Sequence, residues 1–107
     1  MNAIIQVESH GDSKAVSGSS AGAMQITPIL VAECNNILKS RKSKKRFKLS
    51  DRFSIEKSKK MFIIFQSKYN QEHNVEKAIR SWNGGNNYSV RKTQGYYNKV
   101  MRVLRGK

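Results

Sequence analysis

The stretch Glu8–Pro28, ESHGDSKAVSGSSAGAMQITP, decides the fold that we expect for this chain. It begins with a carboxylate that follows several apolar residues, and it continues through a loop rich in serine and glycine. It ends at Thr27-Pro28, where a hydroxyl that can cap a helix precedes a proline suited to the first helical position. The stretch therefore predicts a short helix over residues 2–9, a connecting loop, and a second helix over about 28–38.

Glu8 is the candidate catalytic residue of this stretch. Apolar residues precede it on the predicted helix, so its carboxyl is expected to be partly desolvated, which raises the pKa of an acid. A carboxylic acid that stays protonated near neutral pH can donate a proton to a leaving oxygen, as the cleavage of a glycosidic bond requires. The alternative is a glutamate at a helix end that simply faces solvent, and Glu8-Ser9 alone does not decide between the two.

Apolar side chains at helical spacing predict three further helices. They are expected from Asp51 or Ser54 to about His73, at 75–82 behind an Asn74 cap and before Gly84-Gly85, and at about 94–105 after a polar loop over 86–93. The positions expected on the buried sides of the four later helices are Ile29, Leu30, Val31, Ile37, Leu38, Ile55, Met61, Phe62, Ile64, Phe65, Tyr69, Val75, Ala78, Ile79, Trp82, Tyr97, Val100, Met101 and Leu104. The sequence thus predicts an all-α domain of about five helices with no substantial sheet.

Length and composition favour one small domain over residues 1–107. The single cysteine, Cys34, excludes an internal disulfide, and its apolar neighbours predict a buried reduced thiol. The two histidines, His10 and His73, stand apart from each other and from any metal-ligand pattern. We therefore expect neither a metal site nor a cofactor.

Several blocks of residues occur in a fixed order along the chain: Glu8-Ser9; Ser17; Gly22 with Met24, Gln25, Ile26, Thr27 and Pro28; Trp82-Asn83-Gly84-Gly85; and Tyr96 with Val100 and Met101. This order resembles the lytic transglycosylases of the soluble lytic murein transglycosylase type, which share their fold with goose-type lysozymes. The resemblance covers about residues 3 to 104, and residues 39–50 are the least alike. It implies a compact lysozyme-like fold.

The resemblance also implies a mechanism with a single carboxyl group. Glu8 would protonate the bond between N-acetylmuramic acid and N-acetylglucosamine in peptidoglycan, and would then take a proton from the muramoyl C6 hydroxyl as a 1,6-anhydro ring closes. Ser17 and Gln25 would orient the muramoyl sugar, with Gly22 in the same block. The opposite wall of the cleft would comprise Trp82, Asn83 and Gly84. Tyr96, on the helix that closes the domain, would also take part in substrate binding.

Three departures from the family pattern accompany these matches. Ala23 replaces the usual leucine, and one residue is missing between Ser17 and Gly22. Trp82 replaces a tyrosine whose hydroxyl can point towards the catalytic glutamate, whereas indole offers only an N–H donor. Two alternatives therefore stay open: a muramidase that hydrolyses the same glycan with a second carboxylate, and a catalytically weak wall-binding subunit of a phage or secretion assembly.

The chain is strongly basic, with 21 Lys and Arg against 7 Asp and Glu and a formal charge of +14. Residues 39–48, KSRKSKKRFK, concentrate this charge, and we call them the basic segment. The segment could be a solvated loop, a surface that holds the protein on anionic wall polymers, or a nucleic-acid contact. Specific nucleic-acid recognition is the least favoured of these, since Phe47 is the one aromatic residue in the segment and no DNA-binding motif surrounds it.

The chain shows no signal peptide, because Met1-Asn2 leads straight into the first helix. It also has no apolar run long enough to cross a bilayer. A protein of this kind that acts on the cell wall or in the periplasm would need delivery by a phage particle, a lytic pore or a secretion machine. The sequence is also compatible with a domain of a longer protein, acting as a monomer or within a larger assembly.

Overall fold

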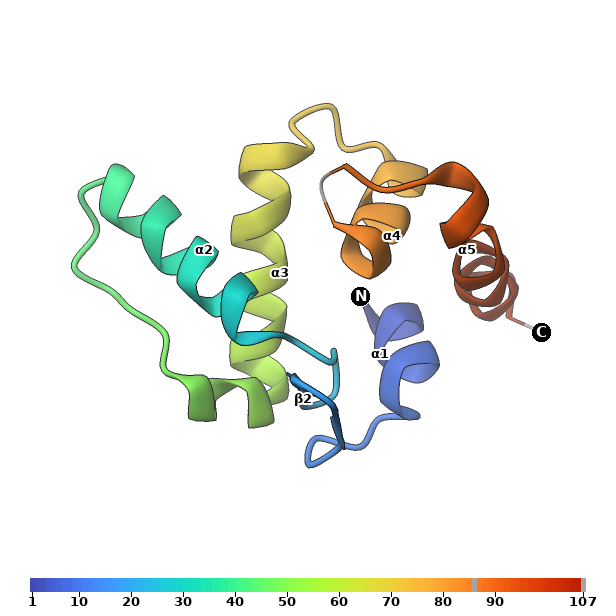
Figure 1. Cartoon of the computed structure of the whole chain (residues 1–107), viewed down its shortest axis with the longest axis horizontal. Helices are drawn as coiled ribbons and strands as arrows, with labels where there is room; N and C mark the ends of the chain where they lie inside the picture. The colour runs from blue at the N-terminus through green and yellow to red at the C-terminus, as the bar shows by residue number, and fades with distance from the viewer. Residues whose placement is uncertain (86, 107) are drawn as a thin grey trace.

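The computed structural model describes residues 1–85 and 87–106, and this part of the chain is mostly helical (Figure 1). These residues form five α-helices, one 3-10 helix and a hairpin of two very short strands, which lies at the edge of the molecule. The elements are α1 (Asn2–Ser9), β1 (Val16–Ser17), β2 (Ser20–Ala21), α2 (Pro28–Ser40), η1 (Leu49–Phe53), α3 (Ile55–Tyr69), α4 (Val75–Gly84) and α5 (Val90–Leu104). The all-α fold class is confirmed.

Side-chain caps set the starting points of the four longer helices. Each of the four residues before these helices accepts a hydrogen bond from a backbone N–H three residues ahead, which satisfies a donor that has no partner inside the helix. The capping residues are Thr27, Ser54, Asn74 and Ser89. The starts at Pro28 and Val75 coincide with those predicted from the sequence, and Ser54 is one of the two residues predicted to open α3.

Two helix boundaries differ from the sequence prediction by about four residues, whereas α2 and α4 extend only two residues beyond their predicted ends. Helix α5 begins at Val90 and not near residue 94, because Ser89 caps a polar first turn that carries no apolar pattern. Helix α3 ends at Tyr69 and not near His73. There the Asn70 side chain bonds both the N–H and the carbonyl of Asn74, which closes the turn into α4.

The core lies where α1 and the segment 21–26 meet the later helices. Figure 1 shows α1 between α3 and α5, and α1 packs against α5, α4 against α5, and α2 against α3. A short apolar helix is thus packed between longer ones, which buries Ala3, Ile4 and Ile5. The buried residues of this core are Ala3, Ile4, Ile5, Ala23, Met24, Ile26, Val31, Cys34, Met61, Phe65, Ile79 and Val100.

Several positions expected on buried faces are instead exposed. The largest difference is at Ile29, which is 82% exposed. The buried face of α2 comprises Val31, Cys34 and Ile37, and at about 100° per residue Ile29 lies on another side of the helix. Leu30 and Leu38 are only half-buried. Ile55, Val75 and Leu104 are also exposed, near the ends of their helices.

Among residues 1–85 and 87–106, none of the helices combines the length and the apolar character needed to cross a bilayer.

Candidate active site

Glu8 lies in the last turn of α1 and is held by a tyrosine from the far end of the chain. The Tyr96 hydroxyl, on α5, donates a 2.9 Å hydrogen bond to Oε2 of Glu8. Both side chains are half-buried, because α1 packs along α5 with its apolar face turned inward. The packing of the two helices therefore fixes the position of the carboxyl group.

The surroundings of Glu8 favour its protonated form. Burial raises the pKa of the Glu8 carboxyl above its ordinary value of 4.5, and the hydrogen bond from Tyr96 opposes this rise with a smaller effect. Burial, with the Glu8 charge beside it, also raises the pKa of the Tyr96 hydroxyl, so that group stays a donor. A carboxyl of this kind can act as a general acid closer to neutral pH than an exposed one.

The loop that follows Glu8 is anchored at Gly22. This glycine has φ 84°, its N–H donates to the Ala15 carbonyl at 2.7 Å, and a Cβ added there would lie 1.7 Å from the Arg52 carbonyl oxygen. Arg52 in turn donates from Nη1 to the carbonyls of Ser19 and Ile26, at 3.1 and 3.2 Å. Close contact with η1 therefore orders a serine-rich loop whose composition alone favours mobility.

Gln25 lies at the end of this loop and lines a cavity of about 400 Å³. It has φ 51°, and its Nε2 donates to the carbonyls of Gly22 and Ala15 at 2.8 and 3.2 Å. The side-chain nitrogen is thus engaged by the loop. Other residues that line the cavity are Ile29, Leu30, Glu33, Phe65, Tyr69, Trp82 and Asn83.

Glu8 does not line this cavity, but the two flank the same short segment. Next to Glu8, the Ser9 hydroxyl donates to the Ala23 carbonyl at 2.8 Å. On the cavity side, Nε1 of Trp82 donates to the carbonyl of the next residue, Met24, at 3.1 Å. Consecutive peptide groups of residues 23 and 24 therefore connect the end of α1 with the cavity wall.

Trp82, Asn83 and Gly84 form the end of α4, and each has different surroundings. The Trp82 indole packs edge-on against Phe62 and Phe65, with ring centroids 4.9 and 6.2 Å away. The side chain of Asn83 is exposed at the rim of the cavity. Gly84 lies so close to α5 that an added Cβ would be 2.8 Å from a Thr93 methyl group. Trp82 is thus both part of the core and a wall of the cavity.

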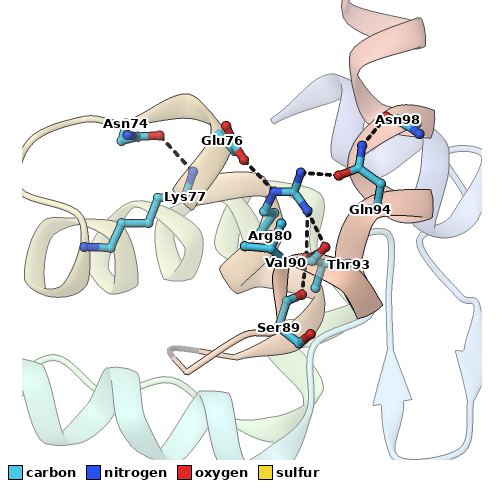
Figure 2. Close-up of polar contacts among 9 residues, drawn as sticks. All are labelled: Asn74, Glu76, Lys77, Arg80, Ser89, Val90, Thr93, Gln94 and Asn98. Atoms are coloured by element: carbon cyan, nitrogen blue, oxygen red, sulfur yellow. Dashed lines mark hydrogen bonds and ion pairs between the residues drawn. The ribbon is translucent and has the colours of Figure 1, made fainter.

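A buried arginine joins α4 to the first turns of α5 (Figure 2). Arg80 is 3% exposed and donates to Glu76 at 2.8 Å, to the Val90 carbonyl at 2.8 Å and to the Thr93 hydroxyl at 3.0 Å. It also donates to Gln94 at 2.7 Å. These bonds fix α5 just before Tyr96, and so they support the contact between Tyr96 and Glu8.

Ser17 occupies a different position from the other candidate residues. It lies in β1, is exposed, and pairs with Ser20 in the hairpin. Within the described ranges, no hydrogen bond joins Ser17 to Glu8. In the same ranges, no group of three or more His, Cys, Asp or Glu residues is arranged to hold a metal ion.

Some residues that shape this region carried no signal in the sequence. Arg52 resembles any other surface cation until its contact with the loop is known. Glu33 belongs to no motif in the sequence, yet it faces the cavity and accepts hydrogen bonds from the Tyr69 hydroxyl and from Lys68. Tyr96, by contrast, was predicted as a substrate-binding residue on the closing helix, and the structure shows that its hydroxyl donates to Glu8, as the Trp82 indole does not.

The comparisons with known proteins agree with this architecture. The family model of the transglycosylase SLT domain matches residues 1–103, which contain Glu8, the cavity and Tyr96. No curated protein and no solved structure gives a significant match. A match over almost the whole chain shows the family, and the chain therefore belongs to the SLT transglycosylases, lytic transglycosylases of the lysozyme-like type that act on peptidoglycan of the cell wall.

Proposed function

We propose that this protein cleaves the β-1,4 bond between N-acetylmuramic acid and N-acetylglucosamine and leaves a 1,6-anhydro ring on the muramoyl product. Glu8 acts first as the acid that protonates the leaving oxygen. The resulting carboxylate then accepts the proton of the C6 hydroxyl, whose oxygen attacks the anomeric carbon. Atoms balance without water, because the sugar supplies its own nucleophile.

The observation that carries the proposal is the half-buried Glu8 carboxyl bonded by the Tyr96 hydroxyl. Burial favours the protonated acid that the first step needs. After proton transfer, the hydrogen bond from Tyr96 stabilises the carboxylate that the second step needs. One group can therefore serve both steps, provided that the glycan reaches it.

The cavity beside segment 23–25 offers a place for the glycan strand. Its apolar side chains, including Trp82, can pack against the faces of sugar rings, and the exposed amide of Asn83 can bond a sugar hydroxyl or acetamido group. In this proposal Gln25 and Ser17 orient the muramoyl sugar, Gly22 shapes the loop that carries them, and Gly84 lets the Asn83 backbone approach the ligand.

The other carboxylates support a mechanism with one acid. In the part of the chain that the structure describes, Asp51, Glu56, Glu72 and Glu76 each pair with a Lys or Arg. Asp12 accepts from the Lys14 N–H within the loop. Glu33 is the acid that lines the cavity, and its Oε2 already accepts from Tyr69 and Lys68. Because Glu33 lines the cavity, it is the acid to test as a second group for hydrolysis with two carboxylates.

Three variants assayed on purified peptidoglycan test the proposal. Glu8→Gln should lower the rate of turbidity loss by about 10²- to 10⁴-fold, because it removes the general acid. Glu33→Gln should still release anhydromuropeptides, and Glu56→Gln, which alters an exposed surface pair, should behave as wild type. Full activity of Glu8→Gln would remove this residue from the mechanism.

Product masses separate the enzymatic alternatives. Anhydromuropeptides are lighter than hydrolysed muropeptides by one water. Products with reducing ends only, together with loss of activity in Glu33→Gln, would instead identify a muramidase. A protein that sediments with peptidoglycan but releases nothing would be a wall-binding subunit.

A further inference from the structure

The basic segment is fixed against α2 at its one aromatic residue. The Asn35 side chain accepts from the Phe47 N–H at 2.7 Å and donates to the Phe47 carbonyl at 3.0 Å. The Phe47 ring packs against the core. In addition, the Arg46 guanidinium donates to the carbonyls of Ser43 and Lys45, at 2.7 and 2.6 Å. A solvated loop needs none of these bonds, so the segment has a defined shape.

Among the described residues, no acid forms an ion pair with the basic segment. The ion pairs of the described residues use Lys57, Lys60, Lys68, Lys77 and Arg80 as their cations. None of these belongs to residues 39–48, where seven Lys and Arg side chains occur without an acid. Seven unpaired cations on an ordered segment form a strongly positive surface.

This segment and α3 border a groove of about 650 Å³. Figure 1 shows the chain leaving the end of α2 and returning through residues 41–48 to η1, at the start of α3. The cations Lys45, Arg46, Lys57 and Lys60 and the apolar side chains of Phe47 and Ile63 are among its lining. Lys60 forms an exposed pair with Glu56 at 3.3 Å, which is weak enough to exchange for a stronger anion. Lys57 makes a long contact of 3.6 Å with the less exposed Asp51, and its own side chain stays half-exposed.

We propose that this groove binds a linear polymer with phosphodiester charges, such as a poly(glycerol phosphate) of the cell envelope. Cations from both borders match charges that repeat along a chain, and the apolar lining matches the carbon atoms between the phosphates. A nucleic acid fits less well, because Phe47 is the one aromatic residue in the lining and is half-buried against the core, whereas strands with bases are held by stacking on several aromatic side chains. A membrane surface fits less well, because the site is concave.

The groove is distinct from the candidate active site. None of the residues that line it lines the cavity beside Gln25. The assignment of the polymer to the cell envelope rests on the proposed function. The proposal that the groove binds such a polymer does not depend on it. The binding test is therefore made on Glu8→Gln protein, in which loss of binding cannot be confused with loss of catalysis.

Two variants with equal charge test the site in this background. The groove variant carries Lys45→Gln, Lys57→Gln and Lys60→Gln. The control variant carries Lys99→Gln, Arg102→Gln and Arg105→Gln, three exposed positions on and just after α5. Binding of poly(glycerol phosphate) is measured by titration calorimetry over a range of salt concentrations. We expect the groove variant to bind at least about tenfold more weakly, with a salt slope shallower by about 2, and the control to change less than about threefold.

A third variant separates shape from charge. Asn35→Ala keeps every cation but releases Phe47, so in the Glu8→Gln background it should weaken polymer binding. Wild-type protein that carries Asn35→Ala should keep its peptidoglycan-cleaving activity. Thermal unfolding and this activity show that the variant is folded. The same titrations with single-stranded DNA and with vesicles of anionic phospholipid provide the comparison.

The outcomes decide the proposal. Selective loss of polymer binding in the groove variant and in Asn35→Ala supports it. Equal weakening in the groove and control variants would show that only the net charge of the protein matters, and would overturn the proposal. Tighter binding of DNA or of vesicles than of poly(glycerol phosphate) would overturn it in favour of that partner.

Discussion

The Tyr96 hydroxyl donates a 2.9 Å hydrogen bond to the Glu8 carboxyl across a sequence separation of 88 residues. Two opposing influences meet at this carboxyl: burial raises its pKa, and the hydrogen bond from Tyr96 lowers it by less. Glu8 must first donate a proton and later accept one. An intermediate pKa suits both steps better than the higher pKa of burial alone or the lower pKa of the hydrogen bond alone.

Replacement of Tyr96 by phenylalanine should change the pH profile as well as the rate. Loss of the donor leaves burial unopposed, so the pKa of Glu8 rises further and the alkaline limb of kcat/KM moves to higher pH. The maximal rate should fall about ten- to hundredfold, the value of a hydrogen bond to a charged group. Tyr97→Phe, at the next position of α5, is the control. An alkaline limb that stays in place would show that Tyr96 does not act on Glu8.

The stability of Glu8→Gln should depend on pH in a defined direction. Because the folded-state pKa of Glu8 is raised above 4.5, its favourable contribution is fully present below that pH and is lost as pH rises through the folded-state pKa. Glutamine stays neutral, so Glu8→Gln should gain melting temperature relative to wild type between about pH 4 and about pH 8. Calorimetric scans at both pH values measure the difference. A constant difference would place Glu8 in a solvent-like environment.

A side chain at Gly22 should destabilise the protein because it would collide with η1. Substitution at Gly11 separates this collision from backbone strain. Gly22 and Gly11 have almost the same φ, 84° and 85°, but an added Cβ would lie 1.7 Å from the Arg52 carbonyl at Gly22 and meet nothing within 4 Å at Gly11. Gly11→Ala should therefore cost only about 1–2 kcal/mol from backbone strain. Gly22→Ala should cost clearly more, and should lower activity because the loop carries Gln25. Urea unfolding compares the two, and equal losses would rule out the close contact with η1.

The sequence contained the local signals of this fold. Thr27-Pro28 and Asn74 mark helix starts through side-chain chemistry that acts within three residues, so the starts of α2 and α4 were predicted correctly. The start of α5 was missed because its first turns bury Thr93 against Arg80, a polar contact that leaves no apolar periodicity. Ser89, a good N-cap, was the available signal.

The candidate site was less predictable because its contacts join distant segments. Spacing places Glu8 at the end of an apolar helix, and family resemblance draws attention to Tyr96, but neither implies that the two side chains meet. The contact of Gly22 with Arg52 depends likewise on how η1 approaches the loop. Ile29 illustrates the converse, since an apolar residue next to a helix start looks buried until the buried face of α2 is known.

Among the buried polar residues, Arg80 is the one whose replacement should lower the stability of the fold most. Its guanidinium is 3% exposed and bonds Glu76, the Val90 carbonyl, Thr93 and Gln94, while lying 4.4 Å from the Tyr97 ring centroid. Arg80→Ala leaves buried acceptors without partners and should destabilise the fold by about 3 kcal/mol. Glu76→Gln, at a partner whose side chain is 50% exposed, should cost less than about 1 kcal/mol. Arg80→Lys should recover little, because an ammonium cannot reproduce the planar fork that spans both helices. Urea denaturation orders the three variants, and an Arg80→Ala loss no larger than that of Glu76→Gln would show that α5 is held by apolar packing alone.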